Sequence, residues 1–148
     1  MIVYLDTSAV VPLVIAEPSS DFCRRLWDEG DAVVTSRLTY VETSAALAQA
    51  HRLGRMESAD LHAARRTLDR LWAEFDVVGV DDMLVRRAAE LAVDLALSGY
   101  DAVHCAAAEQ LEDGDLVVVS GDRTLLDAWR TLGLATADTN DEGALRAS

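Results

Sequence analysis

The chain has 148 residues, of which 51% are hydrophobic, and its 26 acidic and 13 basic side chains give a formal net charge of −13. The hydrophobic content excludes disorder along the whole chain, and no apolar run approaches the roughly 18 residues needed to cross a bilayer. Bulk charge argues against a nucleic-acid binder and suits a basic protein partner. Every basic residue is arginine, however, so local clusters could still hold phosphates.

The ends of the chain and its cysteines indicate a cellular compartment. The N-terminus lacks a basic region and begins in an apolar segment, so we expect no signal peptide and no membrane association. Cys23 and Cys105 match no metal-ligand spacing and are expected to be free, buried thiols in a reducing environment. These features predict a cytoplasmic protein.

Short apolar segments alternate with longer amphipathic ones along the chain. The predicted strands are residues 2–5, 32–35, 77–80, 116–119 and 134–136. The predicted helices are residues 9–16, 20–30, 38–54, 57–74, 82–98, 102–111 and 124–132. This order predicts an α/β fold, a three-layer α/β/α sandwich on a mostly parallel sheet of about 4–5 strands. We expect residues 1–137 to form one domain and the polar tail 138–148 to be mobile.

Four acidic residues are expected at one edge of this sheet. Asp6 and Asp122 follow the two strongest predicted strands, and ligands of parallel α/β sheets bind beyond the carboxyl ends of the strands. Glu42 lies one turn into the helix after the second strand, and Asp101 heads a helix that can begin at the same edge. Each acid alone could instead be structural, because Asp6, Asp101 and Asp122 could cap helices and Glu42 could close a capping box with Thr39.

Taken together, the four acids predict a metal site. Converging carboxylates without a counterion would raise one another's pKa, whereas Mg²⁺ or Mn²⁺ prefers oxygen ligands of this kind. Thr7, Ser8 and Ser120 would add hydroxyls around the metal or its waters. A metal on such a platform can hydrolyse phosphodiester bonds with metal-activated water, leaving a 5′-phosphate and a 3′-hydroxyl.

Other residues and motifs fit catalysis less well. His104 follows Asp101 by one helical turn, and we favour a packed or supporting role for it over a metal ligand or proton donor, while His51 and His62 are expected at the surface. No glycine-rich phosphate loop is present. The absence of lysine argues against a phosphoacceptor receiver domain, and Asp6-Thr7-Ser8 lacks the second Asp of an aspartyl-phosphate phosphatase.

Four segments carry a family resemblance that extends from Met1 to about Thr136. MIVYLDTSAVV, TSRLTYVETSAAL, SGYDAVHCAAA and VVVSGDRTLLDAW resemble, in order and spacing, the signature segments of PIN-domain ribonucleases, and more narrowly the VapC toxins. The resemblance implies a PIN-like sheet with its first strand central, beside residues 116–119. It also implies that the metal-binding acids are Asp6, Glu42, Asp101 and Asp122.

The same resemblance implies an activity and partners. The chain would be a Mg²⁺- or Mn²⁺-dependent endoribonuclease that cuts structured RNA, such as a tRNA or ribosomal RNA. It would be the toxin of a VapBC-type toxin–antitoxin pair, a homodimer inhibited by a VapB-like antitoxin whose basic residues enter the acidic pocket. Two positions depart from the family pattern: Ser98-Gly99-Tyr100 replaces a common Arg-Gly before the third acid, and Ser120 stands where Thr is more usual.

Two further points stay open at this stage. The alternative to an enzyme is a non-catalytic PIN-fold module that docks a basic protein through its acidic pocket, and the intact set of four acids argues against it. For RNA binding, we expect the approach to the pocket to be lined by Arg24 and Arg25 or by Arg65, Arg66 and Arg70. The alternative is that both clusters are ordinary solvated helix faces.

Overall fold

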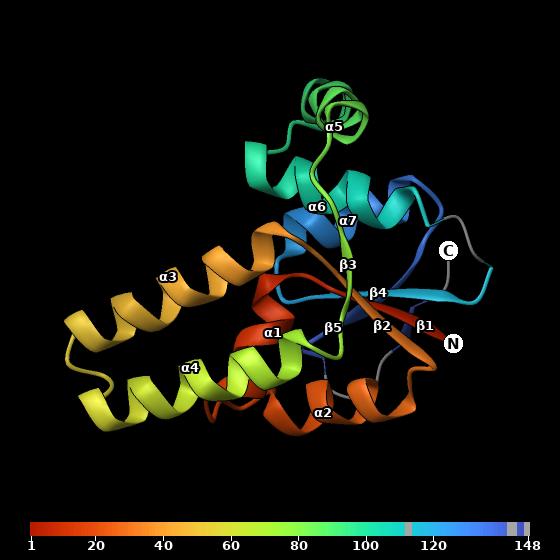
Figure 1. Cartoon of the computed structure of the whole chain (residues 1–148). Helices are drawn as coiled ribbons and strands as arrows, with labels where there is room; N and C mark the ends of the chain where they lie inside the picture. The colour runs from red at the N-terminus through yellow and green to blue at the C-terminus, as the bar shows by residue number, and fades with distance from the viewer. Residues whose placement is uncertain (112–113, 142–144, 147–148) are drawn as a thin grey trace.

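A computed structural model describes residues 1–111, 114–141 and 145–146, and shows a sheet between two layers of helices (Figure 1). The strands are β1 (Ile2–Leu5), β2 (Ala32–Ser36), β3 (Asp76–Val78), β4 (Leu116–Ser120), β5 (Ala135–Asp138) and β6 (Leu145–Arg146). The helices are α1 (Thr7–Val14), α2 (Ser20–Glu29), α3 (Leu38–Arg52), α4 (Ser58–Trp72), α5 (Asp82–Leu95), α6 (Gly99–Glu109) and α7 (Arg123–Thr131). The predicted α/β/α sandwich is confirmed.

The strand order is β3-β2-β1-β4-β5-β6, with β1 central between β2 and β4 as the family resemblance implies. The first five strands in this order pair in parallel, and only β6 runs antiparallel to its neighbour β5. The two-residue β6 was not predicted, because so short a segment carries no periodicity. Leu5 pairs with Val119 in the parallel register, so Asp6 and Ser120 leave adjacent strands at the same edge.

Alternating side chains of β1 supply both halves of the core. Val3 and Leu5 pack with residues of α1, α2 and α4 on one face of the sheet. Tyr4 points to the opposite face, where α5, α6 and α7 cover the sheet (Figure 1). There its ring meets that of Trp129 in a T-shaped contact, with a centroid separation of 5.9 Å. The residues of β1 are therefore held from both sides, which places Asp6 rigidly at the end of the strand.

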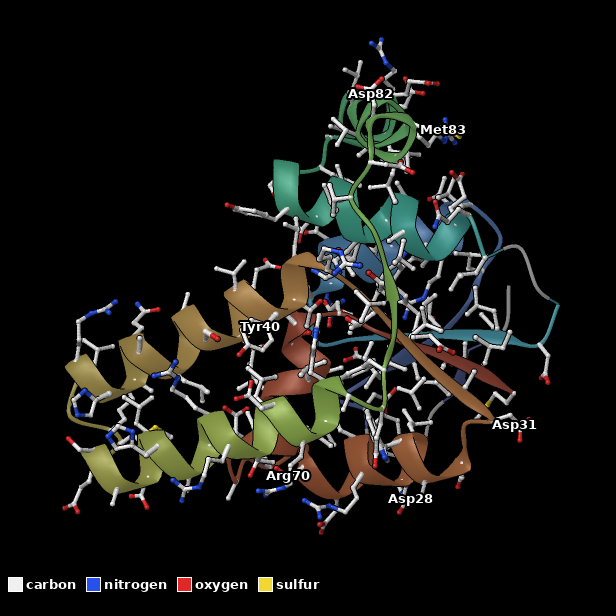
Figure 2. All side chains as sticks on the ribbon, in the orientation of Figure 1. Asp28, Asp31, Tyr40, Arg70, Asp82 and Met83 are labelled. Carbon is white, nitrogen blue, oxygen red and sulfur yellow. The ribbon has the colours of Figure 1, made fainter. Side chains whose placement is uncertain are left out.

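Helices α3 and α4 form an antiparallel hairpin that projects beyond the sheet (Figure 1). Near its base, Tyr40 of α3 lies between the two helices (Figure 2) and donates a hydrogen bond of 2.6 Å to Asp69 of α4. The Tyr40 ring also packs on Trp72 of α4, with a centroid separation of 5.3 Å. These contacts join α3, which carries Glu42, to the rest of the fold.

Several helix boundaries differ from the sequence prediction. Helix α1 begins at Thr7, two residues early, because the Asp6 side chain caps it. Helix α5 ends at Leu95 rather than Ser98, with Ala96 in a left-handed conformation (φ 54°). The Ser98 side chain then accepts a bond from the Asp101 N–H and caps α6, which starts at Gly99 rather than 102. Asp101 therefore lies inside the first turn of α6 and is not its cap, contrary to the structural alternative for this residue.

Three further expectations concern the thiols, the membrane and the tail. Cys23 and Cys105 are free and buried, as predicted, and burial raises their pKa to about 11 and about 12. No helix in the described ranges is long and apolar enough to cross a membrane. The boundary after residue 137 and the mobility of 138–148 stay predictions; residues 142–144 and 147–148 of that tail lie outside the described residues.

Candidate functional site

The four predicted acids line one pocket, of about 400 Å³, at the carboxyl edge of the central strands. Its lining consists of Asp6, Thr7, Ser8, Val11, Glu17, Glu42, Ala46, Asp101, His104 and Asp122. These residues come from the ends of β1 and β4, from the helices α1, α3 and α6, and from the loop after α1. The structure thus brings together acids that are separated by up to 116 positions in the sequence.

Asp6 is the innermost acid, with an exposed fraction of 5%. Its Oδ1 accepts bonds from the Ser8 hydroxyl (2.7 Å) and the Ala9 N–H (3.1 Å), and its Oδ2 accepts one from the Ser120 hydroxyl (2.6 Å). Burial nevertheless raises the pKa of Asp6, against the lowering effects of His104 and these donors. The carboxylate is thus oriented by three protein donors but lacks a full counter-charge.

Asp122 forms a second wall of the pocket, and Ser120 links Asp122 to Asp6. Asp122 caps α7, accepting a bond of 3.3 Å from the Leu125 N–H, so the capping interpretation is confirmed for this acid alongside its place in the pocket. Ser120 does not line the pocket itself. Its hydroxyl accepts a bond of 2.9 Å from the Asp122 N–H while donating to Asp6, and so it fixes the spacing between the two acids.

Asp101 faces the same pocket from the first turn of α6. Burial, followed by the negative charge of Asp122, raises the pKa of Asp101, and Glu42 adds to the rise. The repulsion that the sequence predicted between converging carboxylates is therefore present at Asp101. A positive ion in the pocket would offset it.

Glu42 does not close a capping box with Thr39, so that structural alternative is wrong. The Thr39 hydroxyl instead bonds to the Thr35 hydroxyl at 2.7 Å. Glu42 Oε1 accepts a bond of 2.8 Å from the Thr7 hydroxyl and lies 2.8 Å from Nε2 of His104. Burial acts to raise the pKa of Glu42, but the bond and charge of His104 and the bond from Thr7 bring the pKa below its usual range.

Sequence reasoning missed two residues of the site. The Tyr4 hydroxyl lies 2.8 Å from Nδ1 of His104, and burial raises the pKa of Tyr4 well above the usual value. The only local signal for Tyr4 was a hydroxyl two positions before Asp6 on a strand of otherwise aliphatic residues. Glu17, an exposed residue in the loop after α1, also lines the pocket, and no pattern in the sequence marks it.

The donor set of the pocket fits a hard divalent cation. Five carboxylates, the four predicted acids and Glu17, line one space with the hydroxyls of Thr7 and Ser8, and the raised pKa of Asp6 and of Asp101 is one that a cation would reverse. As placed, no three His, Cys, Asp or Glu side chains of the described ranges are arranged to hold one ion. The carboxylates would therefore have to draw closer around a metal.

The arginine clusters do not line this pocket. Its lining, among the described residues, includes no arginine. Arg24 of α2 and Arg70 of α4 instead line a second cavity of about 880 Å³ beside α1, and Arg70 lies between α4 and α2 in Figure 2. Neither cluster is part of the pocket's own lining, and the prediction that one of them lines the approach to the pocket stays a prediction.

Comparison with known proteins gives consistent matches. The family model described as "PIN domain" matches residues 3–142. The chain is 40% identical over 136 residues to ribonuclease VapC49 of Mycobacterium tuberculosis strain ATCC 25618 / H37Rv, which covers 92% of this chain and 94% of that protein. PAE2754 from Pyrobaculum aerophilum is similar in structure, with a TM-score of 0.65 and 28% identity over 85% of this chain and 78% of that chain.

A third match is to a complex. DNA-bound VapBC from Salmonella typhimurium has a TM-score of 0.66 and 17% identity, over 94% of this chain and 98% of that chain. At this identity the similarity shows a shared fold and nothing more. The family match and the curated relative both span nearly the whole chain, so they apply to the pocket as well as to the sheet.

Proposed function

Because this chain belongs to the PIN-domain family, as a member of the VapC type, we propose that it is a Mg²⁺- or Mn²⁺-dependent endoribonuclease and the toxin of a VapBC-type pair. The single observation that carries the proposal is the convergence of Asp6, Glu42, Asp101 and Asp122 on one pocket. The chain's relative VapC49 bears the name ribonuclease, which supports RNA as the substrate class.

In this proposal the four carboxylates would bind the metal, and neighbouring hydrogen-bond donors would orient the carboxylates. When bound, the metal would supply Lewis acidity to the scissile phosphate and favour deprotonation of an attacking water. Ser8, Ser120 and the Ala9 N–H keep Asp6 oriented, and Thr7 and His104 keep Glu42 oriented. No side chain of the pocket needs to act as a nucleophile: the oxygen of a water would bond to phosphorus while the bond to the 3′ oxygen breaks, so the products would carry a 5′-phosphate and a 3′-hydroxyl.

The decisive experiment is RNA cleavage by the purified chain with and without metal. We expect cleavage of tRNA or ribosomal RNA in Mn²⁺ or Mg²⁺, none in EDTA, and a loss of at least about a hundredfold in Asp6→Asn and Asp101→Asn with the fold retained. Asp82→Asn is the matched control, because Asp82 lies on the exposed surface of α5, away from the pocket (Figure 2). Cleavage that persists in EDTA or in both variants would overturn the proposal.

The alternative, a non-catalytic module that docks a basic protein, makes a different prediction for metal. An enzyme of the proposed kind should gain thermal stability from Mn²⁺, and the gain should vanish in Asp6→Asn. A docking module should be indifferent to Mn²⁺ and cut no RNA. Burial raises the pKa of Asp6, and burial with the charges of Asp122 and Glu42 raises that of Asp101; a bound cation would offset both costs, which favours the enzyme.

A path for RNA is suggested by three cavities that share residues. The acidic pocket shares Glu17 with a cavity of about 620 Å³ beside the α3–α4 hairpin. That cavity shares Val14, Ile15 and Thr67 with the cavity that contains Arg24 and Arg70. We propose that a phosphate of bound RNA reaches these two arginines, since a chain with a net charge of −13 needs local positive charge to hold a polyanion.

The remaining parts of the proposal concern partners and location. A VapB-like antitoxin with basic residues fits a pocket lined by five acids.

A homodimer would cover the exposed apolar side chains near the pocket, Val41 (58% exposed) and Tyr100 (62% exposed), which adjoin Glu42 and Asp101 in the sequence. Size-exclusion chromatography with light scattering tests the dimer. We propose the cytoplasm as its location, because the proposed RNA substrates are found there.

A further inference from the structure

We propose that His104 is a positioning residue which, oriented by Tyr4, holds the carboxylate of Glu42 ready for a ligand in the pocket. The inference rests on the proposed function and names a role for two residues that the acid quartet does not include. Its basis is a chain of side-chain contacts from β1 to α6 to α3, in which Tyr4 and Glu42 each lie 2.8 Å from one nitrogen of the His104 ring.

Each end of the imidazole has one well-placed partner. The Tyr4 hydroxyl lies 2.8 Å from Nδ1, and Glu42 Oε1 lies 2.8 Å from Nε2. Thr7 Oγ1 is 3.4 Å from Nε2 and donates its own bond to Glu42 Oε1. Among contacts of the described residues, both donors therefore engage Oε1 and leave Oε2 as the oxygen available to a ligand.

The chemistry of these groups fixes the direction of the bond to Glu42. A carboxylate only accepts, so a short contact with Nε2 requires a proton on that nitrogen. In the neutral ring the proton on Nε2 leaves Nδ1 bare, and Nδ1 then accepts from the neutral phenol of Tyr4. In the charged ring both nitrogens donate, and Nε2 again donates to Glu42. In either case Nε2 donates to the Glu42 carboxylate, and the Tyr4 hydroxyl, which can donate to a bare Nδ1 or accept from a protonated one, keeps the ring in that orientation.

The ring has little freedom to leave this position. His104 is 3% exposed and its ring packs edge-on against Tyr4, with a centroid separation of 6.1 Å. Tyr4 has no exposed surface and packs in turn against Trp129. His104 lines the pocket, but both of its ring nitrogens already have protein partners, so we assign it a role through Glu42.

The arrangement also ties two pocket walls together. His104 lies on α6, one turn after Asp101, whereas Glu42 lies on α3. Holding Glu42 from α6 therefore sets its separation from Asp101. A carboxylate that is oriented before a cation arrives loses less side-chain entropy on binding, so the loss of the bond should weaken cation binding.

The test compares four variants by Mn²⁺ titration calorimetry without RNA, together with kcat and KM for RNA cleavage. His104→Leu removes both hydrogen bonds and keeps a side chain of similar volume, whereas His104→Gln keeps an N–H donor. Tyr4→Phe removes only the hydroxyl oxygen and leaves the ring packed in the core. His62→Leu is the control, since His62 is exposed on α4. Histidine ¹⁵N chemical shifts of the metal-free chain report which ring nitrogen carries the proton.

We expect Mn²⁺ affinity to fall about 10- to 100-fold in His104→Leu, less in Tyr4→Phe, and to recover in part in His104→Gln. The kcat should fall with little change in KM, His62→Leu should match the wild type, and Nε2 of His104 should be protonated. A folded His104→Leu or Tyr4→Phe that binds Mn²⁺ as the wild type does, or an unprotonated Nε2, would overturn this inference alone. A wild type that neither binds Mn²⁺ nor cuts RNA would overturn the proposed function itself.

Discussion

The hydroxyl of Ser120, at the end of β4, donates a bond of 2.6 Å to the carboxylate of Asp6, just past the end of β1. The bond spans two adjacent parallel strands and connects residues 114 positions apart. The Ser120 oxygen also accepts from the Asp122 N–H at 2.9 Å, so one fully buried hydroxyl holds two acids of the site at a set spacing.

Loss of this hydroxyl in Ser120→Ala should destabilise the chain. Asp6 would lose one of three donors in a buried position and the Asp122 N–H would lose its acceptor, at a cost of about 1–3 kcal/mol in the free energy of unfolding. Urea unfolding in EDTA measures this value. Ser120→Thr, which keeps the hydroxyl, is the control. An Ala variant as stable as the wild type would contradict the role given to Ser120.

Asp6→Asn should raise stability while it abolishes activity. The folded state raises the pKa of Asp6, so the charged carboxylate reduces the free energy of unfolding above that pKa, and the reduction disappears as the pH falls below the ordinary carboxyl value. Asn is as good a helix cap as Asp and carries no charge. In EDTA at pH 7 its melting temperature should exceed that of the wild type by at least about 2 °C.

The pH dependence supplies the control for this variant. The advantage of Asp6→Asn should shrink as the pH falls through the raised pKa of Asp6 toward the ordinary carboxyl range, because Asp6 of the wild type takes up a proton there. The lowered pKa of Glu42 acts in the opposite direction, but it is common to both proteins and cancels in the comparison. An advantage that stays constant with pH would mean that charge burial at Asp6 is not its cause.

Gly121→Ala should destabilise the loop between β4 and α7. A Cβ at this position would lie 2.6 Å from the Thr139 hydroxyl oxygen, closer than atoms can approach, so the chain or that side chain must shift. We expect a loss of about 1–3 kcal/mol in thermal or urea unfolding. Gly79→Ala is the matched control, because a Cβ there meets no atom within 4 Å. When Thr139→Ala is combined with Gly121→Ala, the stability lost through Gly121→Ala should be smaller. If the effects of the two substitutions on the free energy of unfolding simply add, the proposed clash is contradicted.

The two thiols should be inert in the native chain. Burial raises the pKa of Cys23 to about 11 and that of Cys105 to about 12, so neither is a thiolate at pH 8. A thiol-specific disulfide reagent should find almost no reactive group in the folded protein and two after denaturation. Fast reaction of either cysteine in the native chain would show that its surroundings open readily.

Neutralising Arg24 and Arg70 together should weaken RNA binding and reduce its dependence on salt. Each phosphate contact that is lost should lower the slope of log K against log salt by about 0.7–0.9. Arg86→Ala is the control, since Arg86 is exposed on α5 and paired with Asp82. Filter binding at several salt concentrations, with an inactive variant in EDTA, gives the slope. An unchanged slope would leave the two arginines as structural parts of their cavity.

Local sequence was enough to locate the parallel strands and the helices, and to place Asp6 and Asp122 at the site. Apolar runs such as residues 116–119 read as buried strands whatever their neighbours are, and an acid directly after a parallel strand must lie at its carboxyl edge, which is why Asp6 and Asp122 were placed correctly. Both also cap helices, a property that depends only on adjacent residues. The charge of −13 and the free thiols likewise need no tertiary structure to be stated.

Tertiary structure alone decided how the rest of the site is built. Thr39 and Glu42 fit a capping box locally, yet Glu42 bonds to Thr7 and His104, because the fold brings Thr7 of α1 and His104 of α6 within 2.8 Å of its carboxylate. The contacts of Tyr4 with His104 and of Ser120 with Asp6 join residues 100 and 114 positions apart. Such contacts depend on strand register and helix packing, which no short stretch of sequence encodes, and so only the folded chain specifies them.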